Sequence, residues 1–276
     1  MRVISQLFFR TTRPINFMES SHYDIIIVGA GIAGSALAHA LSSITSLSRK
    51  EPLRICLLER SLAEPDRIVG ELLQPGGVMA LKRLGMQECL QNIDAIPVHG
   101  YCVIKSGDIV HIPYPDRHEG RTFHHGRFVQ ALRTKAKRAS GVDVVEASVS
   151  ELIECDYTRR VIGVRATRKG LEKKEGFWAD LVVIADGCFS NFRSVVMGPA
   201  GRKTRTTSQF VGAILEDARL PMAQHGTVAL VKGSGPVLLY QIGEHDTRIL
   251  IDVKQPLPSD LKACTSPPSD QVWRFR

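Results

Sequence analysis

Residues 23–43 read YDIIIVGAGIAGSALAHALSS, and this stretch decides the fold of the first half of the chain. YDIIIV (23–28) is a short apolar run typical of a buried strand. IAGSALAHALSS (32–43) has the composition of a helix, and GAGIAG (29–34) lies between the two. A strand, a glycine-rich turn and a helix in this order predict the start of a dinucleotide-binding unit.

The loop GAGIAG satisfies the pattern GxGxxG. In that pattern Gly29 allows a tight turn, Gly31 lets the backbone approach a pyrophosphate, and Gly34 lets helix and strand pack closely. The next apolar run, LRICLLE (53–59), is predicted to be the second strand and ends in Glu59, near the spacing expected for an acid that binds a ribose. The motif does not separate FAD from NAD, and a glycine turn without a ligand is the alternative.

Composition sets broad limits on the class of protein. With 276 residues and 43% hydrophobic content, the chain can bury one large core or two smaller ones. The net charge of +8 fits a polyphosphate cofactor, an acidic membrane surface or nucleic acid equally well. No apolar run reaches the ~18 residues that a membrane-spanning helix needs. Six scattered cysteines without a CxxC pair favour a reducing compartment and no structural zinc.

The rest of the chain alternates helical and strand patterns. QPGGVMALKRLG (74–85) reads as a helix that ends at Gly85, and HGRFVQALRTKAKRAS (125–140) as an amphipathic helix with a basic outer face. SGD (106–108) is predicted to be a hairpin turn. Strands are predicted at 142–147, 148–155, 161–168 and 177–186, and three β-rich runs between 227 and 254 predict an antiparallel meander.

VVIADGCFSNFR (182–193) supplies a second functional signal. An apolar strand ends there in Asp186 and Gly187, and a segment containing Arg193 follows. A lone Asp-Gly pair is usually only a turn. Far downstream of GxGxxG, however, it resembles the DG motif that lies near the dinucleotide in flavin-dependent hydroxylases, which favours FAD over NAD.

PDRIVGELLQPGG (65–77) carries the most specific resemblance. An arginine, an acid and a glutamine stand among apolar residues there, and the segment resembles a signature of the squalene epoxidase (squalene monooxygenase) family. Further motifs agree with that family: HGY (99–101), IPYP (112–115), FHHGRF (123–128), ADGCFSNFR (185–193) and PVLLYQIGEHDTRILIDV (236–253). The resemblance covers roughly residues 22–255, in order. It implies that the signature shows polar groups to a flavin and apolar ones to a hydrocarbon.

The resemblance also implies a set of site residues. The cofactor positions are Gly29, Gly31, Ile32, Ala33 and Gly34 in the glycine loop, Glu59 and Arg60 at the adenosine end, Arg67, Leu72 and Arg127 near the flavin, and also Val149, Asp186 and Gly187. Gln74 and Tyr101 fall at positions that shape the substrate pocket. Guanidinium groups suit pyrophosphate and flavin oxygens. No side-chain nucleophile or metal is implied, so His124 and His125 are expected to be structural.

The implied activity is FAD-dependent epoxidation of squalene to (S)-2,3-epoxysqualene with O₂, in sterol biosynthesis. NADPH-cytochrome P450 reductase is the implied electron donor, and the cytosolic face of the endoplasmic reticulum membrane is the implied location. Two alternatives stay open: an FAD-dependent hydroxylase of soluble aromatic substrates, and a non-catalytic nucleotide-binding module. Nucleic acid is not expected as a partner, because the basic runs RTKAKR (133–138) and GRKTR (201–205) contain no interleaved aromatic residues.

We therefore predict an α/β fold, with a Rossmann-like FAD-binding domain of the flavin hydroxylase type and an incomplete β-rich substrate domain. The predicted boundaries are a disordered leader at 1–21, a discontinuous FAD-binding domain at 22–98 and 120–205, the start of a substrate domain at 99–119 and 206–256, and an irregular tail at 257–276. The first 17 residues contain three arginines and no acid, which also fits a transit peptide. The family's second flavin motif, which begins Gly-Asp, and its C-terminal apolar helices have no counterpart in the sequence. We expect the chain alone to bind FAD weakly and to have little activity.

Overall fold

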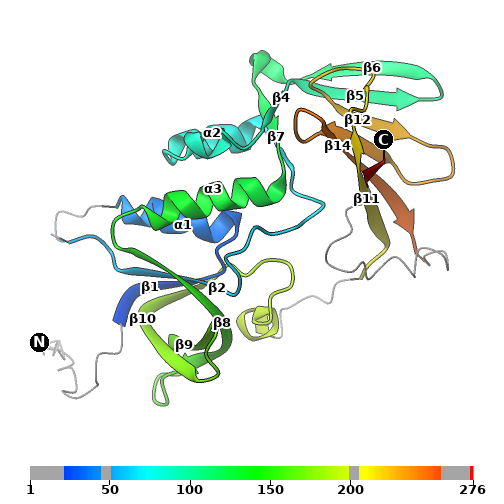
Figure 1. The fold of residues 1–276 in the computed structure, drawn as a ribbon. Helices are drawn as coiled ribbons and strands as arrows, with labels where there is room; N and C mark the ends of the chain where they lie inside the picture. Colours follow the sequence, from blue (N-terminus) through cyan, green and yellow to red (C-terminus); the bar gives the residue numbers. More distant parts are fainter. Residues whose placement is uncertain (1–21, 45–50, 199–204, 256–273, 276) are drawn as a thin grey trace, which may run out of the picture.

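The computed structural model describes residues 22–44, 51–198 and 205–255, and the backbone of 274–275. These residues form an α/β unit that holds the glycine loop and, beside it, a β-rich unit (Figure 1). The leader predicted at 1–21 and nearly all of the tail predicted at 257–276 lie outside the described residues, as do residues 201–204 of the second basic run.

Four parallel strands form the base of the α/β unit, in the order β8-β2-β1-β10. Their bounds are β1 His22–Val28, β2 Ile55–Glu59, β8 Val142–Glu154 and β10 Lys174–Ile184, and β9 (Val161–Arg168) runs antiparallel to β8 and β10 and closes the strands into a ring. The prediction of two strands within 142–155 is wrong. β8 is one strand that continues through a register shift between Val149 and Glu151, because an extra residue bends a strand without ending it.

The side chains of β1 enter two separate cores. Ile25 and Ile27 pack with the helices α1 (Ile32–Ser42) and α3 (His125–Lys137), which cover one face of the parallel strands (Figure 1). Ile26 and Val28 pack inside the ring with residues of β8 to β10. Successive strand side chains point to opposite faces, so a continuous apolar run is what a strand buried on both faces requires.

A small three-stranded sheet, in the order β3-β7-β4, begins within the signature segment. Its strands are β3 (Leu72–Leu73), β4 (Ile96–Val98) and β7 (Gly120–Thr122). Between β3 and β4 lie α2 (Pro75–Arg83) and the 3₁₀ helix η1 (Gln87–Leu90). Gly85 follows α2 with φ of +66°, which confirms the predicted end of that helix.

The β-rich unit is a seven-stranded sheet in the order β15-β11-β14-β13-β12-β5-β6. The strands are β5 Gly100–Lys105, β6 Asp108–Pro113, β11 Ser208–Glu216, β12 Gly226–Leu230, β13 Val237–Gln241, β14 Asp246–Lys254 and β15 Arg274–Phe275. The predicted hairpin (β5-β6) and the predicted meander (β12-β13-β14) are confirmed. β12 joins them by pairing parallel with β5, and β15 gives the end of the predicted irregular tail a two-residue strand beside β11.

The chain passes between the two units three times. It enters the β-rich unit after β4, returns through the 3₁₀ helix η2 (Pro115–Arg117) to β7, and enters it again between α4 (Arg193–Met197) and β11. Strands that are far apart in the sequence therefore meet in one sheet.

One edge of the parallel sheet lies open in the described part of the chain. β10 pairs with β9 through Lys174–Trp178 and with β1 through Trp178–Ile184. Beyond Trp178, the edge of β10 that faces away from β1 has no strand partner among the described residues. Leu181 on this stretch is 53% exposed.

Candidate flavin site and substrate cavity

The glycine loop is closed on its inner side and open on its outer side. Gly29 has φ of +104°, and a side chain there would lie 2.8 Å from the Cα of Asp186. A Cβ on Gly34 would overlap the carbonyl oxygen of Gly29. A Cβ on Gly31, by contrast, would meet no atom within 4 Å, and the neighbouring Ile32 and Ala33 are exposed. The turn therefore needs its first and third glycines for packing and leaves free space at the second.

The two sequence motifs meet at the carboxyl ends of β1 and β10. Gly29 contacts Ala185 and Asp186, the residues that begin the DG turn. Gly187 has φ of +84°, and Arg193 folds back to donate a hydrogen bond to the carbonyl oxygen of Cys188 at 2.7 Å. In open parallel sheets, ligands bind outside the carboxyl ends of the strands, so the structure brings both motifs to the expected edge.

Glu59 and a buried arginine hold the centre of the glycine loop. The carboxylate of Glu59 accepts a hydrogen bond from the backbone N–H of Ala30 at 2.8 Å. Arg133 of α3 donates from Nε to the carbonyl oxygen of Ala30 at 2.8 Å, and its Nη2 lies 3.5 Å from Glu59 Oε2. Burial lowers the pKa of Arg133, and the carboxylate of Glu59 opposes that effect. Both backbone groups of Ala30 are thus fixed by charged side chains.

The prediction that the basic residues of α3 lie on its outer face is wrong for Arg133, because the side chain of Arg133 is only 8% exposed. The residue was missed as a site residue. A signal was available, since Arg133 follows Val129 by four positions and precedes Ala136 by three, and both are buried. Positions with that spacing share one face of a helix, so Arg133 had to lie on the apolar face.

The predicted arginines and Val149 lie in different settings. Arg60 and Arg67 are exposed on the segment that follows β2. Arg127, in the first turn of α3, is half-buried and its Nη1 lies 3.3 Å from Asp94 Oδ2. Val149 packs against the apolar cluster inside the ring of strands.

Gln74 and Tyr101 are brought together as predicted pocket residues. The side-chain amide of Gln74 donates a hydrogen bond to the hydroxyl of Tyr101, which lies on β5. They line a cavity of about 230 Å³ between the signature segment and the β-rich sheet. Its other lining residues are mostly apolar: Val69, Gly70, Glu71, Leu72, Gly226, Val228, Leu238, Tyr240 and Leu250. Such a lining, with few polar groups, is typical of small-molecule pockets.

An apolar row crosses the sheet beneath this cavity. Strand register places the following residues side by side on one face, in order from β6 to β11: Val110, Val103, Val228, Leu238, Leu250 and Gly212. Neighbouring strands are ~4.8 Å apart, so the row spans about 24 Å. A Cβ on Gly212 would lie 3.2 Å from Ile68, and one on Gly226 would lie 3.5 Å from Leu72. These two glycines let the signature segment approach the row.

The expectation that the polar residues of the signature face a flavin is wrong for Glu71. Its carboxylate turns into the β-rich sheet and accepts hydrogen bonds from Nε and Nη2 of Arg248 at 2.9 and 2.8 Å. The Tyr240 hydroxyl donates to the same carboxylate at 3.2 Å. Burial, with the nearby carboxylate, raises the pKa of Tyr240. Glu71 therefore joins the two units.

The two histidines of FHHGRF make structural contacts. His124 Nε2 lies 3.0 Å from Asp246 Oδ2, and Nδ1 of His125 donates to the carbonyl oxygen of Gly70 at 3.1 Å. In the described ranges no three side chains of His, Cys, Asp or Glu gather closely enough to hold a metal ion. The described helices also include none with the length and apolar content needed to cross a bilayer.

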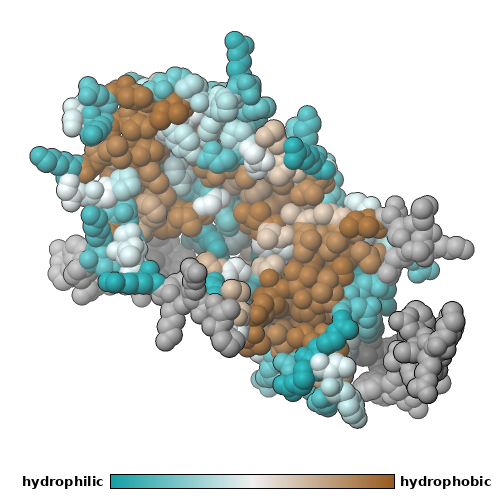
Figure 2. Space-filling view, turned by 180° about the vertical axis from the view of Figure 1, so that it is seen from behind, coloured by the Kyte–Doolittle hydropathy of each residue, from teal (hydrophilic) through white to brown (hydrophobic). Residues whose placement is uncertain are grey.

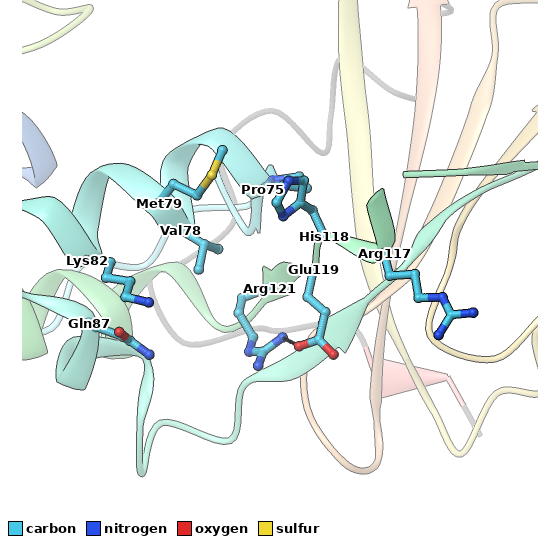
Figure 3. Close-up of a pocket in the computed structure, with 9 residues that line it drawn as sticks. All are labelled: Pro75, Val78, Met79, Lys82, Gln87, Arg117, His118, Glu119 and Arg121. Carbon is cyan, nitrogen blue, oxygen red and sulfur yellow. Dashed lines mark hydrogen bonds and ion pairs between the residues drawn. The ribbon is translucent and has the colours of Figure 1, made fainter. Parts of the chain in front are cut away.

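A second, larger hollow of about 290 Å³ lies beside α2. The hollow is lined by four residues of α2 (Pro75, Val78, Met79 and Lys82), by Gln87 and by residues of the segment 117–121 (Figure 3). Within this lining, Glu119 pairs with Arg121 at 2.7 Å. None of the predicted site residues lines this hollow. The smaller, apolar cavity is the better candidate for the substrate site.

A glycine loop against a DG turn, with a mixed, mostly antiparallel sheet beside them, defines the fold of flavin-dependent monooxygenases. Two solved structures share it: pqsL, a probable FAD-dependent monooxygenase from Pseudomonas aeruginosa, and the myxobacterial halogenase CndH. The TM-score is 0.69 for each, at 18% and 19% identity, over 85% and 89% of this chain and 61% and 55% of those chains. At this identity the likeness shows the fold alone.

Sequence relatives are more specific. The family model of squalene epoxidase matches residues 178–265. Squalene epoxidase erg1 of Aspergillus fumigatus is 45% identical to this chain over 251 residues, which cover 88% of this chain and 49% of that protein. Squalene epoxidase 1 of Arabidopsis thaliana is 42% identical, and the match covers 89% of this chain and 45% of that protein. The chain thus belongs to the squalene epoxidase family, and it spans about half the length of the curated relatives it matches.

Proposed function

We propose that the glycine loop and the DG turn hold the FAD of a squalene epoxidase. The free space at Gly31 and the start of α1, which no side chain caps among the described residues, suit a pyrophosphate. Glu59 and Arg60 lie at the end of β2, where the adenosine would be held, and Asp186 and Gly187 border the loop. Arg67, Leu72, Arg127 and Val149 are proposed flavin contacts by family position. FAD, when bound, supplies the oxygen chemistry, and the protein supplies orientation.

The substrate that we propose is squalene, converted to (S)-2,3-epoxysqualene. The observation that carries this proposal is the apolar row of about 24 Å, which suits a long hydrocarbon better than a compact aromatic ring. The Gln74–Tyr101 pair supplies the polar groups of the cavity and would shape the end where the alkene reacts. The name of the relatives, squalene epoxidase, agrees with this substrate.

We also propose an electron donor and a location. NADPH-cytochrome P450 reductase would supply electrons, and the cytosolic face of the endoplasmic reticulum membrane would be the site of action. The net charge of +8 is compatible with an acidic membrane surface. Apolar side chains also gather on the surface of the β-rich unit (Figure 2), and Ile109, Val110 and Ile112 of β6 are about half exposed.

The test begins with flavin binding. The purified chain is incubated with FAD and desalted, and its visible spectrum is recorded. Squalene, NADPH, the reductase and air are then supplied, and epoxysqualene is measured by mass spectrometry. A weak flavin band and a small yield of epoxysqualene are the expected result for the proposed function, because we expect the chain alone to bind FAD weakly and to have little activity. A colourless protein rejects FAD binding by this chain alone, and flavin retention with turnover of a phenol instead of squalene rejects the substrate.

A further inference from the structure

The pair formed by Glu71 and Arg248 is the most deeply buried ion pair among the described residues. The side chain of Glu71 is 1% exposed and that of Arg248 is 6% exposed. Two hydrogen bonds from Arg248 and one from Tyr240 satisfy the carboxylate. Glu71 stands in the α/β unit, whereas Tyr240 and Arg248 lie opposite each other on β13 and β14.

The backbone around Glu71 reaches the parts of the α/β unit that border the cavity. The carbonyl oxygen of Glu71 accepts a hydrogen bond from the N–H of Phe123 at 2.9 Å, and the next residue, Leu72, pairs with Thr122. Leu72 packs on the apolar cluster of the sheet, and Gln74 contacts Tyr101. Glu71 is therefore fixed to the α/β unit through its backbone and to the sheet through its side chain.

A buried ion pair is a poor source of stability, because desolvation of two charges offsets most of their attraction. A bidentate contact between guanidinium and carboxylate is strongly directional, however, and allows one relative position of its two partners. Two apolar side chains in the same space would let the segment around Glu71 slide along the sheet. The geometry of this pair suits positioning better than stabilisation.

We propose that Arg248 is a positioning residue, which acts through Glu71 to hold segment 70–74 at a fixed height above the apolar row. That height sets the width of the cavity between Leu72, Gln74 and the sheet. The proposal rests on the proposed function for the identity of the ligand, squalene, and deepens it by naming what shapes the site. Arg248 touches no reacting atom in this scheme.

The experiment compares the wild-type chain with Glu71→Leu/Arg248→Met, which removes both charges, and with Arg248→Lys, which keeps the charge but loses the fork. Three quantities are measured: melting temperature, hydrogen exchange of the amides in 70–74, and binding of radiolabelled squalene in detergent micelles. Single variants that remove only one of the two charges are avoided, because the partner charge left buried would strongly destabilise the chain. Lys135→Met, which removes an ion pair with Glu88 far from the cavity, is the control.

We expect the double variant to melt within a few degrees of wild type, while exchange in 70–74 accelerates about tenfold or more and squalene binds about tenfold more weakly. Arg248→Lys should lie between the two. Wild-type exchange and wild-type squalene binding in a folded double variant would overturn the proposal. If the wild-type chain itself binds no squalene, the proposed function fails, and exchange in 70–74 alone then decides whether Arg248 positions the segment.

Discussion

At the scale of single residues, Arg133 and Glu59 show how charge is used to shape a backbone. Together they bind both the N–H and the carbonyl oxygen of Ala30, the residue between the first two glycines. Arg133 also donates to the carbonyl oxygen of Ala63 at 3.0 Å, so it links the loop to the segment that follows β2. The glycine-rich turn is therefore ordered by side chains that are distant in the sequence.

Replacement of Arg133 with methionine should destabilise the chain by about 3 kcal/mol, because it leaves Glu59 and two carbonyl oxygens without their buried partner. FAD binding should weaken as well. Lys135→Met on the same helix removes a partly exposed pair and should cost less than about 1 kcal/mol. Urea unfolding of both variants checks the difference, and equal losses would contradict the role given to Arg133.

The glycines of the loop should separate folding from cofactor binding. Gly34→Ala should cost about 3 kcal/mol or more, because its Cβ would overlap the Gly29 carbonyl, a backbone atom that cannot move aside freely. Gly31 has φ of −79° and open space around it, so Gly31→Ala should change stability by less than about 1 kcal/mol. It should nevertheless weaken FAD binding, because the methyl group occupies the proposed pyrophosphate space. Thermal melts and flavin titrations measure both effects; normal FAD affinity in Gly31→Ala would place the phosphates elsewhere.

The sequence predicted the local parts of this site and not its long-range partners. GxGxxG, Glu59 and the DG turn are each encoded in a few neighbouring residues, and the structure brings the two motifs together. Glu71 and Arg248 are 177 positions apart, and Ala30 and Arg133 are 103 apart. No periodicity links such pairs, since only the packing of whole elements decides which charges meet. For the same reason, the bent strand β8 was predicted as two strands. The register shift arises from its pairing with β9 and leaves no mark in the apolar pattern of the sequence.

At the scale of elements, α1 and α2 are joined by a histidine whose protonation the fold opposes. Nε2 of His39 donates to the carbonyl oxygen of Leu84, just after α2, at 3.1 Å. Its Nδ1 is buried and has no hydrogen-bond partner among the described residues. Burial, and then the charge of Lys135, lower the pKa of His39 below 6.5. The neutral ring is therefore the form that fits between these helices.

This depressed pKa predicts how stability depends on pH. The unfolded chain binds a proton on His39 more readily than the folded chain, so stability from this residue is complete above pH 6.5. It is lost as the pH falls from 6.5 through the lower pKa of the folded state. His39→Gln can keep the bond to Leu84 and does not titrate. Melting temperatures between pH 7.5 and 5.5 should therefore fall further in wild type than in this variant, and parallel curves would contradict the prediction.

At the scale of the whole molecule, three chain crossings and several polar contacts tie the two units together. Besides Glu71 and Arg248, the carboxylate of Asp94 accepts from the N–H of Glu244, and His124 lies beside Asp246. Domains that are joined by one linker and a small interface often unfold separately. Here, by contrast, the two units are built from parts of the chain that alternate along the sequence.

We expect a single unfolding transition for this reason. Urea curves followed by far-UV circular dichroism and by tryptophan fluorescence should coincide, as two-state unfolding requires. Asp94→Ala should shift both curves together, because its contact bridges the units. Two separated transitions would show that the units are independent despite their interleaving.

The interleaved order also has a consequence for synthesis on the ribosome. Val103 of β5 pairs with Val228 of β12, and 125 residues separate them. At ~5–20 residues per second, translation delivers β12 roughly 6–25 seconds after β5. During that interval the β5-β6 hairpin has emerged while the strand that β5 joins is still unmade. For many seconds the nascent chain therefore exposes an apolar hairpin whose strand β5 lacks its partner. Such a hairpin is a natural binding site for chaperones, and this is the stage at which the protein would most readily misfold.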